Sequence, residues 1–353
     1  MAGNANLGAA KAAKNDEFYT QWNDIENEMQ AYLEYDPDVF RGKTVLLPCD
    51  DPGASNFTKY FALNFEKFGL KKLISTSYAP ASNPAVTEKG QMLLDFALGE
   101  DQDEKFNEDD TWLRGRIYVL EQGTDLNEDG KLNKEDLKWD YLEGDVQFSV
   151  IGNSNAITYK EVFPLIKENR LWLGATGNTT DMVFRVPQGA VVKESDKAKA
   201  ARLGYPSTET TTYTRLGNSC WFTNIEHGRR HEPLVLMTMD DNLIYGSKRV
   251  REIAYAKYEN YNAIEVPETK GIPSDYEGAM GVPISFLDKY NPEQFEILGA
   301  SLFDATPMKE VAKPGDLFQQ GGLAFYIRED ESTLRRLYFR LIVRHRHPET
   351  KES

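Results

Sequence analysis

The sequence predicts an α/β protein with a parallel sheet in residues 15–226 and a strand-rich region in residues 227–353. Three observations predict this class. The chain has 353 residues, the length of about two average domains. Up to about residue 226, short β-prone apolar runs alternate with amphipathic helical stretches, the pattern of a doubly wound sheet. Beyond it, prolines separate short apolar runs. A ligand site is expected where the parallel strands end.

Composition narrows the class of protein further. Hydrophobic residues make up 40% of the chain, and no run of about 18 apolar residues could cross a membrane. Residues 1–14 carry no periodic apolar pattern and no apolar signal-peptide core, so we expect a disordered tail. Cys49 and Cys220 are too few for a secreted disulfide framework. The expected location is the cytoplasm, with no membrane partner.

The first elements form a βαβ unit. Residues 17–35 repeat apolar side chains at close to 3.6 residues and predict a helix. Residues 44–47 predict a strand, Ser55 is placed to cap a helix running to residue 68, and residues 72–76 predict a second strand. A strand, a turn, a helix and a strand in this order indicate two parallel strands.

The elements that follow continue the alternation. Strands are predicted at residues 116–120, 146–151 and 171–174, with a helix at 159–168. Near the C-terminus, the apolar runs at residues 323–327 and 337–343 flank a charged turn and predict a hairpin. No internal repeat is found.

Charge is unevenly distributed along the chain. The net charge is −15, and residues 95–145 carry 17 acidic and six basic side chains, which is −11 of that total. This stretch is interpreted as an acidic insert in the first region. Five arginines occur between residues 335 and 346 without an acidic neighbour, interleaved with aromatic residues. Such a strip fits either phosphate contacts or a strand with a solvated face.

The acidic insert contains a loop with the spacing of a calcium site. Asp125, Asn127 and Asp129 occupy positions one, three and five of an EF-hand-like loop, with Gly130 at the sharp turn. Position twelve is Asp136, where a bidentate Glu is usual. Calcium bound by these four ligands would stiffen the insert. The alternative is a solvated acidic turn.

The turn after the first strand offers the clearest ligand chemistry. Asp50 and Asp51 follow that strand and precede a helix. Carboxylates suit the hydroxyl and ammonium groups of a nucleotide-like cofactor such as S-adenosylmethionine, whereas a glycine-rich turn suits pyrophosphate. The alternative is that the acidic pair only complements the helix dipole. The sequence has no Walker loop, no Gly-x-Gly-x-x-Gly after a strand, no zinc spacing and no Gly-x-Ser-x-Gly elbow.

Several strings in the sequence resemble the EcoRI-type adenine-specific DNA methyltransferases. The first two are Lys-Asn-Asp-Glu-Phe-Tyr-Thr at residues 14–20 and Leu-Leu-Pro-Cys-Asp-Asp-Pro at residues 46–52. Others lie at residues 55–61, 140–145, 155–161, 221–224, 230–233 and 290–295. Together they cover nearly the whole chain after residue 14.

The resemblance implies a Rossmann-like methyltransferase core that uses S-adenosylmethionine to methylate the exocyclic amine of adenine in duplex DNA, as in restriction-modification. It implies that the cofactor is held at two segments, which consist of Phe18, Tyr19, Thr20, Pro48, Cys49, Asp50, Asp51 and Pro52. DNA contact is expected in the C-terminal region, on Arg229, Arg230, Arg335, Arg336 and Arg340, with the acidic insert facing away. The recognition sequence and the oligomeric state stay open.

One departure from the family pattern concerns catalysis. Enzymes of this type carry Asn-Pro-Pro-Phe at the end of a sheet strand, and this tetrapeptide is absent here. It is expected between the segment ending at Asp145 and the strand beginning near Phe148, so one central strand-helix unit of about 40 residues is missing from the core. No catalytic residue is assigned. Three interpretations stay open: a DNA adenine methyltransferase, a non-catalytic binder of DNA or S-adenosylmethionine, and a calcium-stabilised interaction protein.

Overall fold

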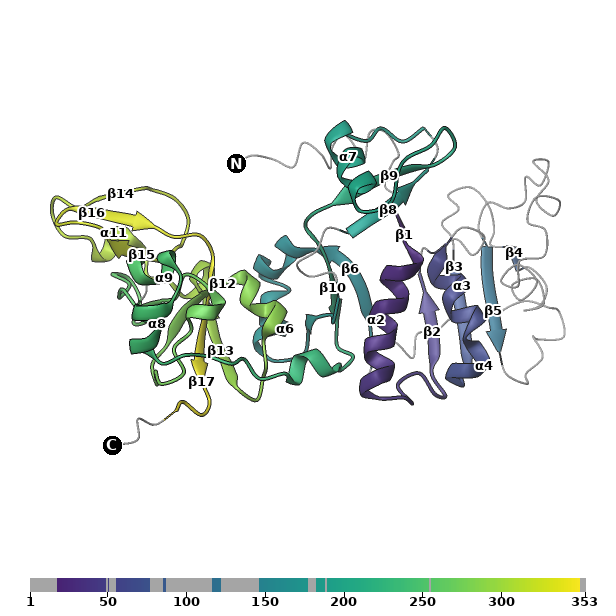
Figure 1. The fold of residues 1–353 in the computed structure, drawn as a ribbon, viewed down its shortest axis with the longest axis horizontal. Helices are drawn as coiled ribbons and strands as arrows, with labels where there is room; N and C mark the ends of the chain where they lie inside the picture. Colours follow the sequence, from purple (N-terminus) through teal and green to yellow (C-terminus); the bar gives the residue numbers. More distant parts are fainter. Residues whose placement is uncertain are drawn as a thin grey trace. The chain divides into compact units, whose positions relative to one another are not determined.

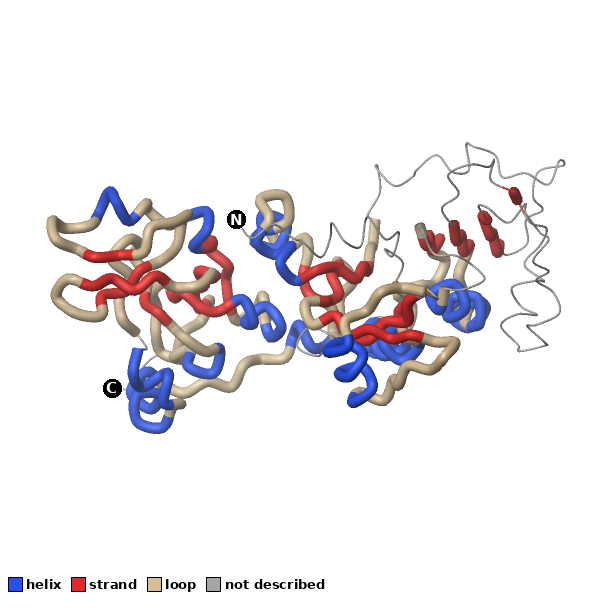
Figure 2. The backbone as a smooth tube through the Cα atoms, turned by 90° about the horizontal axis from the view of Figure 1, so that it is seen from above, coloured by secondary structure: helices blue, strands red, loops and turns tan. Residues whose placement is uncertain are grey.

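A computed structural model describes residues 18–48, 50, 55–76, 85–86, 116–121, 146–176, 182–187, 189–253 and 255–349. It is a mixed α/β protein with several sheets (Figures 1 and 2). Contacts divide the chain into two compact units. Unit one comprises Met1–Phe148 and Thr180–Ser219, and unit two comprises Ser149–Thr179 and Cys220–Ser353. Residues 149–179 thus group with the C-terminal residues, whereas the functional boundary at residues 226 and 227 stays a prediction.

The predicted βαβ unit lies in unit one and is confirmed. Strand β2 (Thr44–Leu47) pairs in parallel with β3 (Lys72–Thr76), in register from Thr44 opposite Lys72 to Leu47 opposite Ser75. Helices α3 (Asn56–Leu63) and α4 (Phe65–Phe68) connect the two strands. Gly69 ends α4 with φ at +62°, a left-handed conformation that glycine adopts without strain.

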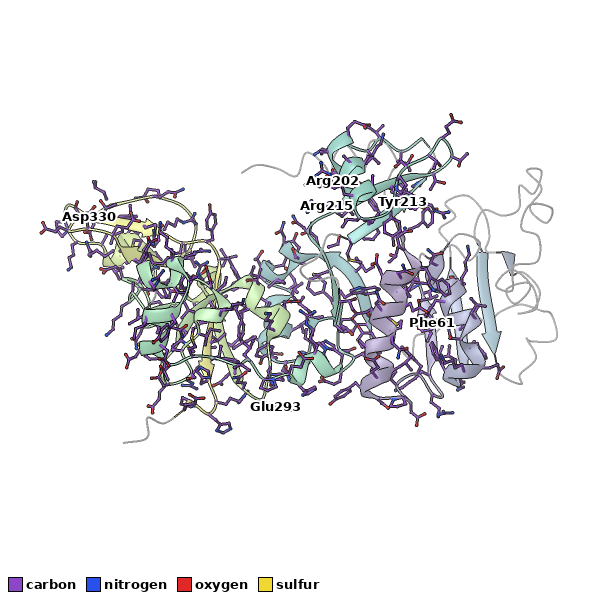
Figure 3. The ribbon with its side chains drawn as sticks, viewed as in Figure 1. Phe61, Arg202, Tyr213, Arg215, Glu293 and Asp330 are labelled. Atoms are coloured by element: carbon purple, nitrogen blue, oxygen red, sulfur yellow. The ribbon has the colours of Figure 1, made fainter. Side chains whose placement is uncertain are left out.

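The helices of unit one supply part of its buried core. Helix α2 (Trp22–Tyr35) buries Ile25, Met29 and Tyr32, which follow one another at four- and three-residue steps and so share one face. Next to it, Phe61 packs edge-to-face against Phe40 with ring centroids 5.5 Å apart (Figure 3). Aromatic edge-to-face packing of this kind fixes α3 against the turn that follows α2.

The described residues of unit one form two sheets. The first is completed by two further strands. Strands β5 (Arg116–Glu121) and β4 (Ala85–Val86) give the order β2-β3-β5-β4, with β5 antiparallel to β3. The second sheet has the order β1-β8-β9, from β1 (Tyr19–Thr20), β8 (Met182–Val186) and β9 (Thr212–Leu216). Helix α7 (Glu194–Arg202) lies between β8 and β9 in the chain and packs on β9 (Figure 1).

Unit two contains three sheets. The first has the order β6-β10-β7, formed by β6 (Ser149–Asn153), β10 (Ser219–Thr223) and β7 (Trp172–Leu173). A second has the order β11-β12-β17-β13, and its strands are β11 (Ile264–Glu265), β12 (Met280–Pro283), β13 (Phe295–Ala300) and β17 (Arg340–His345). The third has the order β14-β16-β15, and its strands are β14 (Leu317–Phe318), β15 (Tyr326–Arg328) and β16 (Thr333–Arg336).

The C-terminal hairpin differs from the sequence prediction. Strand β15 pairs in antiparallel fashion with β16, which lies inside the charged turn expected at the tip. The predicted second strand continues separately as β17 and pairs with β12 and β13 in another sheet. Charged residues of the expected turn thus belong to a strand, in which Leu334 is buried between the partly exposed Thr333 and Arg335.

Short helices connect the strands of unit two. They are α6 (Phe163–Lys167), α8 (Met239–Tyr245), α9 (Lys248–Ile253), α10 (Ser301–Asp304) and α11 (Met308–Val311), with 3-10 turns at Ser154–Thr158, Gly228–His231, Thr269–Gly271 and Ile284–Lys289. Among the described residues, no helix is long and apolar enough to span a bilayer.

Strand β12 requires glycine at position 281. The phenol of Tyr258 lies directly over Gly281, where a Cβ atom would collide with the hydroxyl oxygen. Tyr258 is 5% exposed and stacks on Phe325 with centroids 4.4 Å apart, so it has no room to move aside. Glycine at this position therefore lets the tyrosine close over the strand.

Candidate functional site

The carboxyl ends of β2 and β3 meet at one edge of the sheet, as parallel strands require. Asp50 follows β2 closely, and its carbonyl oxygen accepts a hydrogen bond from the Ser75 hydroxyl of β3 at 2.6 Å. Because that hydroxyl has only one proton, the 2.7 Å contact between Ser75 and Thr58 must be donated by Thr58. Both hydroxyl residues are fully buried, so this network fixes the turn where a ligand is expected.

Ser55 connects the same turn to helix α3. Its hydroxyl oxygen accepts from the backbone N–H groups of Phe57 and Thr58, which confirms Ser55 as the N-cap. The hydroxyl also donates to Asp50 Oδ1 at 2.7 Å. Burial raises the pKa of the Asp50 carboxyl, and this hydrogen bond lowers it by a smaller amount. Among the described residues, the second carboxylate oxygen of Asp50 has no hydrogen-bond donor.

The segment Phe18–Thr20 joins this edge through helix α3. Asn56, the first residue of α3, donates from its side-chain amide to the Thr20 carbonyl at 2.8 Å. Ser55 contacts Asp50 and Asn56 contacts Thr20, so one helix N-terminus binds both predicted cofactor segments. Phe18 is 42% exposed and Thr20 is buried.

Two cations next to β1 were not predicted from the sequence. Arg185 of β8 lies opposite Tyr19 in the sheet register, and its guanidinium is 4.9 Å from the centroid of the tyrosine ring. Lys59 is one turn after Asn56 on α3; burial and then the nearby charge of Arg185 lower the pKa of its ammonium group. The only sequence signal was Lys59's place in the family string at residues 55–61. Arg185 reaches the site through a long-range strand pairing that has no local signature.

The other predicted ligand residues fall outside what can be described. Cys49, Asp51 and Pro52 lie outside the described residues, and so do all four calcium-loop positions, Asp125, Asn127, Asp129 and Asp136. Pro48 is exposed at the end of β2. Within the described part of the chain, no group of three His, Cys, Asp or Glu side chains could hold a metal ion. Calcium therefore has no support from the described residues.

Arg340, expected to contact DNA, lies in the core of unit two. It is 4% exposed, and its guanidinium donates from Nη2 and Nε to the Glu265 carboxylate at 2.8 to 3.2 Å. The Tyr258 hydroxyl donates to the same carboxylate at 2.6 Å. A guanidinium so enclosed cannot reach a phosphate, and the prediction for Arg340 is corrected. The sequence did not show this because Glu265 lies 75 residues away.

The other four arginines also have partners within the fold. Arg230 is 4% exposed and stacks over Trp172, with its guanidinium carbon 3.8 Å from the ring centroid. Arg229 donates to Asp288 at 2.6 Å and to the Ala175 carbonyl at 2.7 Å. The remaining two lie on β16 and are partly exposed: Arg335 pairs with Glu329 at 3.0 Å, and Arg336 donates to the Gly322 carbonyl at 3.1 Å.

Comparison with known proteins decides the family. The model of the family described as adenine-specific methyltransferase EcoRI matches residues 6–150 and 140–346. The chain belongs to this family. No solved structure matches the chain.

Relatives of this EcoRI-type methyltransferase cover most of its length. It is 39% identical to the type II methyltransferase M.EcoRI of Escherichia coli over an alignment of 320 residues, which covers 84% of this chain and 90% of that one. It is 31% identical to M.MpnI of Mycoplasma pneumoniae over 82% of this chain and 83% of that one. For M.MgeORF184P of Mycoplasma genitalium the identity is 32%, over 82% of this chain and 84% of that one. The resemblance expected from the sequence strings is confirmed, and with it a methyltransferase of restriction-modification.

Proposed function

We propose that this EcoRI-type methyltransferase binds S-adenosylmethionine and duplex DNA and methylates the exocyclic amine of adenine at a severely reduced rate. One observation supports the binding part above all. The end of β2, the end of β3 and the segment Phe18–Thr20 converge on the N-terminus of α3 through the contacts of Asp50, Ser75 and Thr20. The Rossmann-like arrangement of this core belongs to the proposal.

The side chains at this edge fit the groups of S-adenosylmethionine, which has a ribose, an amine, a carboxylate and a sulfonium but no phosphate. Bound there, the cofactor supplies the methyl group. The Asp50 carboxylate, with Asp51 and Pro52 beside it in sequence, accepts hydrogen bonds from hydroxyl or ammonium groups. Arg185 and Lys59 provide positive charge next to Tyr19, which suits a carboxylate.

The expected loss of rate rests on the missing catalytic motif. The adenine amine is a weak nucleophile because its lone pair is delocalised into the ring, and acceptors such as the Asn side chain and prolyl carbonyl of Asn-Pro-Pro-Phe counter this in the transition state. That tetrapeptide occurs nowhere in the 353-residue sequence. The two family matches overlap at residues 140–150, the point at which the segment is expected. Because the family match is divided into two parts at this point, it supports the interpretation that the motif-bearing segment is missing from this chain.

Replacement of the motif by the Asn-rich turn after β6 is disfavoured, because the Asn153 side chain already accepts from the backbone N–H of Asn155 at 2.9 Å.

A methyl-transfer assay tests the proposal. Labelled methyl incorporation from S-adenosylmethionine into mixed-sequence duplex DNA is measured for this chain and for a variant with an Asn-Pro-Pro-Phe strand-helix segment inserted after Asp145. Loss of one well-placed active-site group costs roughly a hundred- to a thousand-fold in rate, so we expect the unmodified chain to be slower by at least that factor. Comparable turnover by both chains would contradict the proposal. Failure of the unmodified chain to bind S-adenosylmethionine in a parallel titration would reject the cofactor site.

A further inference from the structure

The lobe of unit one formed by β8, α7 and β9 is basic in an acidic chain. Residues 182–216 contain six basic and three acidic side chains, a net charge of +3, while the whole chain carries −15. Arg202 on α7 and Arg215 on β9 both belong to this lobe (Figure 3). A local excess of positive charge is what a polyanion requires when the global charge is repulsive beyond a Debye length of about 8 Å.

Helix α7 separates its charges by face. Ala200 is fully buried against the lobe, so the opposite face is turned to solvent. Positions that follow one another at i, i+3, i+4 and i+7 share that face, and they are Ser195, Ala198, Lys199 and Arg202, all exposed. The exposed acid of the helix, Glu194, is engaged by Lys197 at 2.8 Å. The solvent face thus offers two cations, one hydroxyl and one small side chain.

The cations of this face are available for a partner. Neither Lys199 nor Arg202 makes an ion pair or a side-chain hydrogen bond within the described residues, and the same holds for Lys193 just before the helix. By contrast, two arginines of the predicted DNA-contact set are paired within unit two, Arg340 with Glu265 and Arg229 with Asp288. Lys199 and Arg202 on α7 thus present positive charge that no described side chain neutralises.

We infer that the solvent face of α7 contacts the phosphate backbone of duplex DNA through Lys199 and Arg202, with the Ser195 hydroxyl as a further donor. The inference rests on the proposed function only in taking DNA as the substrate. Small side chains at 195 and 198 let the helix approach a backbone closely, and lysine, arginine and serine are the usual phosphate donors. Contacts of this kind position the DNA without reading its sequence.

Fluorescence anisotropy on labelled mixed-sequence duplex DNA tests the surface, with the full chain and salt varied from about 50 to 200 mM. For Lys199→Gln with Arg202→Gln we expect roughly tenfold weaker binding at low salt. The slope of log affinity against log salt should fall by about 2, since each lost phosphate contact removes ~0.9. Lys199→Arg with Arg202→Lys, which keeps both charges, should retain the wild-type slope.

A matched control removes the same charge elsewhere in unit one. Lys43 and Lys71 are exposed and precede β2 and β3, at the opposite ends of the strands from Asp50, so Lys43→Gln with Lys71→Gln should leave the slope unchanged. If the two cations of α7 act only on the helix dipole, their double Gln variant loses thermal stability and keeps the wild-type slope, which overturns the inference. If binding to anionic vesicles depends on Lys199 and Arg202 but binding to DNA does not, the inference is overturned as well.

The outcome is separable from that of the proposed function. Titration with S-adenosylmethionine should give the same affinity for the wild type and the α7 variant. DNA binding with equal slopes in the wild type and the variant rejects this surface alone. Absence of DNA binding by the wild type rejects both.

Discussion

At the scale of single residues, Asp50 carries the chemistry proposed for the cofactor edge. Ser55 occupies one carboxylate oxygen, and burial has raised the pKa of the carboxyl. A carboxyl in this position gains more from a bound ammonium or hydroxyl donor than one in water, because the local dielectric is lower. The charge of Asp50 is therefore expected to contribute to cofactor binding, in addition to the position that the turn gives its side chain.

Asp50→Asn should weaken S-adenosylmethionine binding by about tenfold, equivalent to ~1.4 kcal/mol. The amide keeps the size of the side chain and can still accept from Ser55, so the effect isolates the charge. Isothermal titration calorimetry measures it. Asp38→Asn is the control, since Asp38 is an exposed carboxylate bound to Arg41 in the same unit. Equal affinity of Asp50→Asn and the wild type would remove Asp50 from the site.

Asp24 makes the stability of unit one depend on pH. Burial in the first turn of α2 raises the pKa of its carboxyl to about 6 from the usual 3.8. A raised carboxyl pKa means that the folded state holds its proton more tightly than the unfolded chain does. The free energy of unfolding therefore falls as pH rises from about 4 through 6, the opposite of the usual carboxylate effect.

Asp24→Asn should remove this dependence. Above pH 6.5 the variant should be more stable than the wild type by up to about 1 kcal/mol, the full pKa shift being discounted because the group is partly exposed to solvent. Near pH 4 the two proteins should be equally stable. Urea unfolding at both pH values, followed by the fluorescence of the neighbouring Trp22, measures the difference. A gain of equal size at both pH values would show that ionisation is not the cause.

At the scale of elements, a buried ion pair spans one strand of unit two. Glu265 of β11 and Arg340 of β17 both flank β12, and Glu265 lies opposite Gly281 in the register. Removing one partner would leave an uncompensated charge in the core. Glu265→Gln should therefore destabilise unit two by about 3 kcal/mol.

Replacing both Glu265 and Arg340 by uncharged residues provides the control for that variant. The pair Glu265→Gln with Arg340→Met should be less destabilised than Glu265→Gln alone, since no buried charge is left unpaired. Guanidinium chloride unfolding of the three proteins measures the difference. If the single and double variants lose the same stability, the ion pair is not coupled as its geometry indicates.

Prediction from sequence succeeded where structure is local. Strands β2 and β3, the Ser55 cap and the helix end at residue 68 follow from residues adjacent in the chain, and the structure has them at the predicted positions. Pairings over long separations left no such signal. Strand β1 is two residues long and exists only because β8 pairs with it across more than 160 positions.

The candidate site divides in the same way. Asp50 was found because a carboxylate after a strand and before a helix is a local pattern. Arg185 was missed because β8 brings it to Tyr19 from far along the chain. The error at Arg340 has the same origin, since an arginine without acidic neighbours in sequence acquired one in space, Glu265. Charge read along a chain does not give the charge on the surface.

At the scale of the whole molecule, the two compact units should unfold separately. Each has its own sheets and its own buried core, and multi-unit chains often unfold in more than one step. Differential scanning calorimetry should therefore show two transitions. Fluorescence melts of variants that keep only Trp22, or only Trp172 and Trp221, of the chain's five tryptophans then assign one transition to each unit. A ligand held at the Asp50 edge should raise only the transition of unit one.

Saturating S-adenosylmethionine provides the test of that assignment. At about a hundred times its dissociation constant, it should stabilise unit one by ~2.7 kcal/mol and leave the second transition in place. One coincident transition for the Trp22 signal and for the Trp172 and Trp221 signal would show that the chain unfolds as a single cooperative structure. A shift confined to the Trp172 and Trp221 signal would place the ligand in unit two.

The contact between Tyr258 and Gly281 couples the substitutions that these two positions can accept in evolution. The phenol ring fills the space above the glycine, and its hydroxyl also binds Glu265. A side chain at position 281 would require a smaller residue in place of Tyr258. The Glu265 carboxylate would then lose the hydrogen bond that the Tyr258 hydroxyl donates. Among descendants of this chain, positions 258, 265 and 281 should therefore change together or stay as they are.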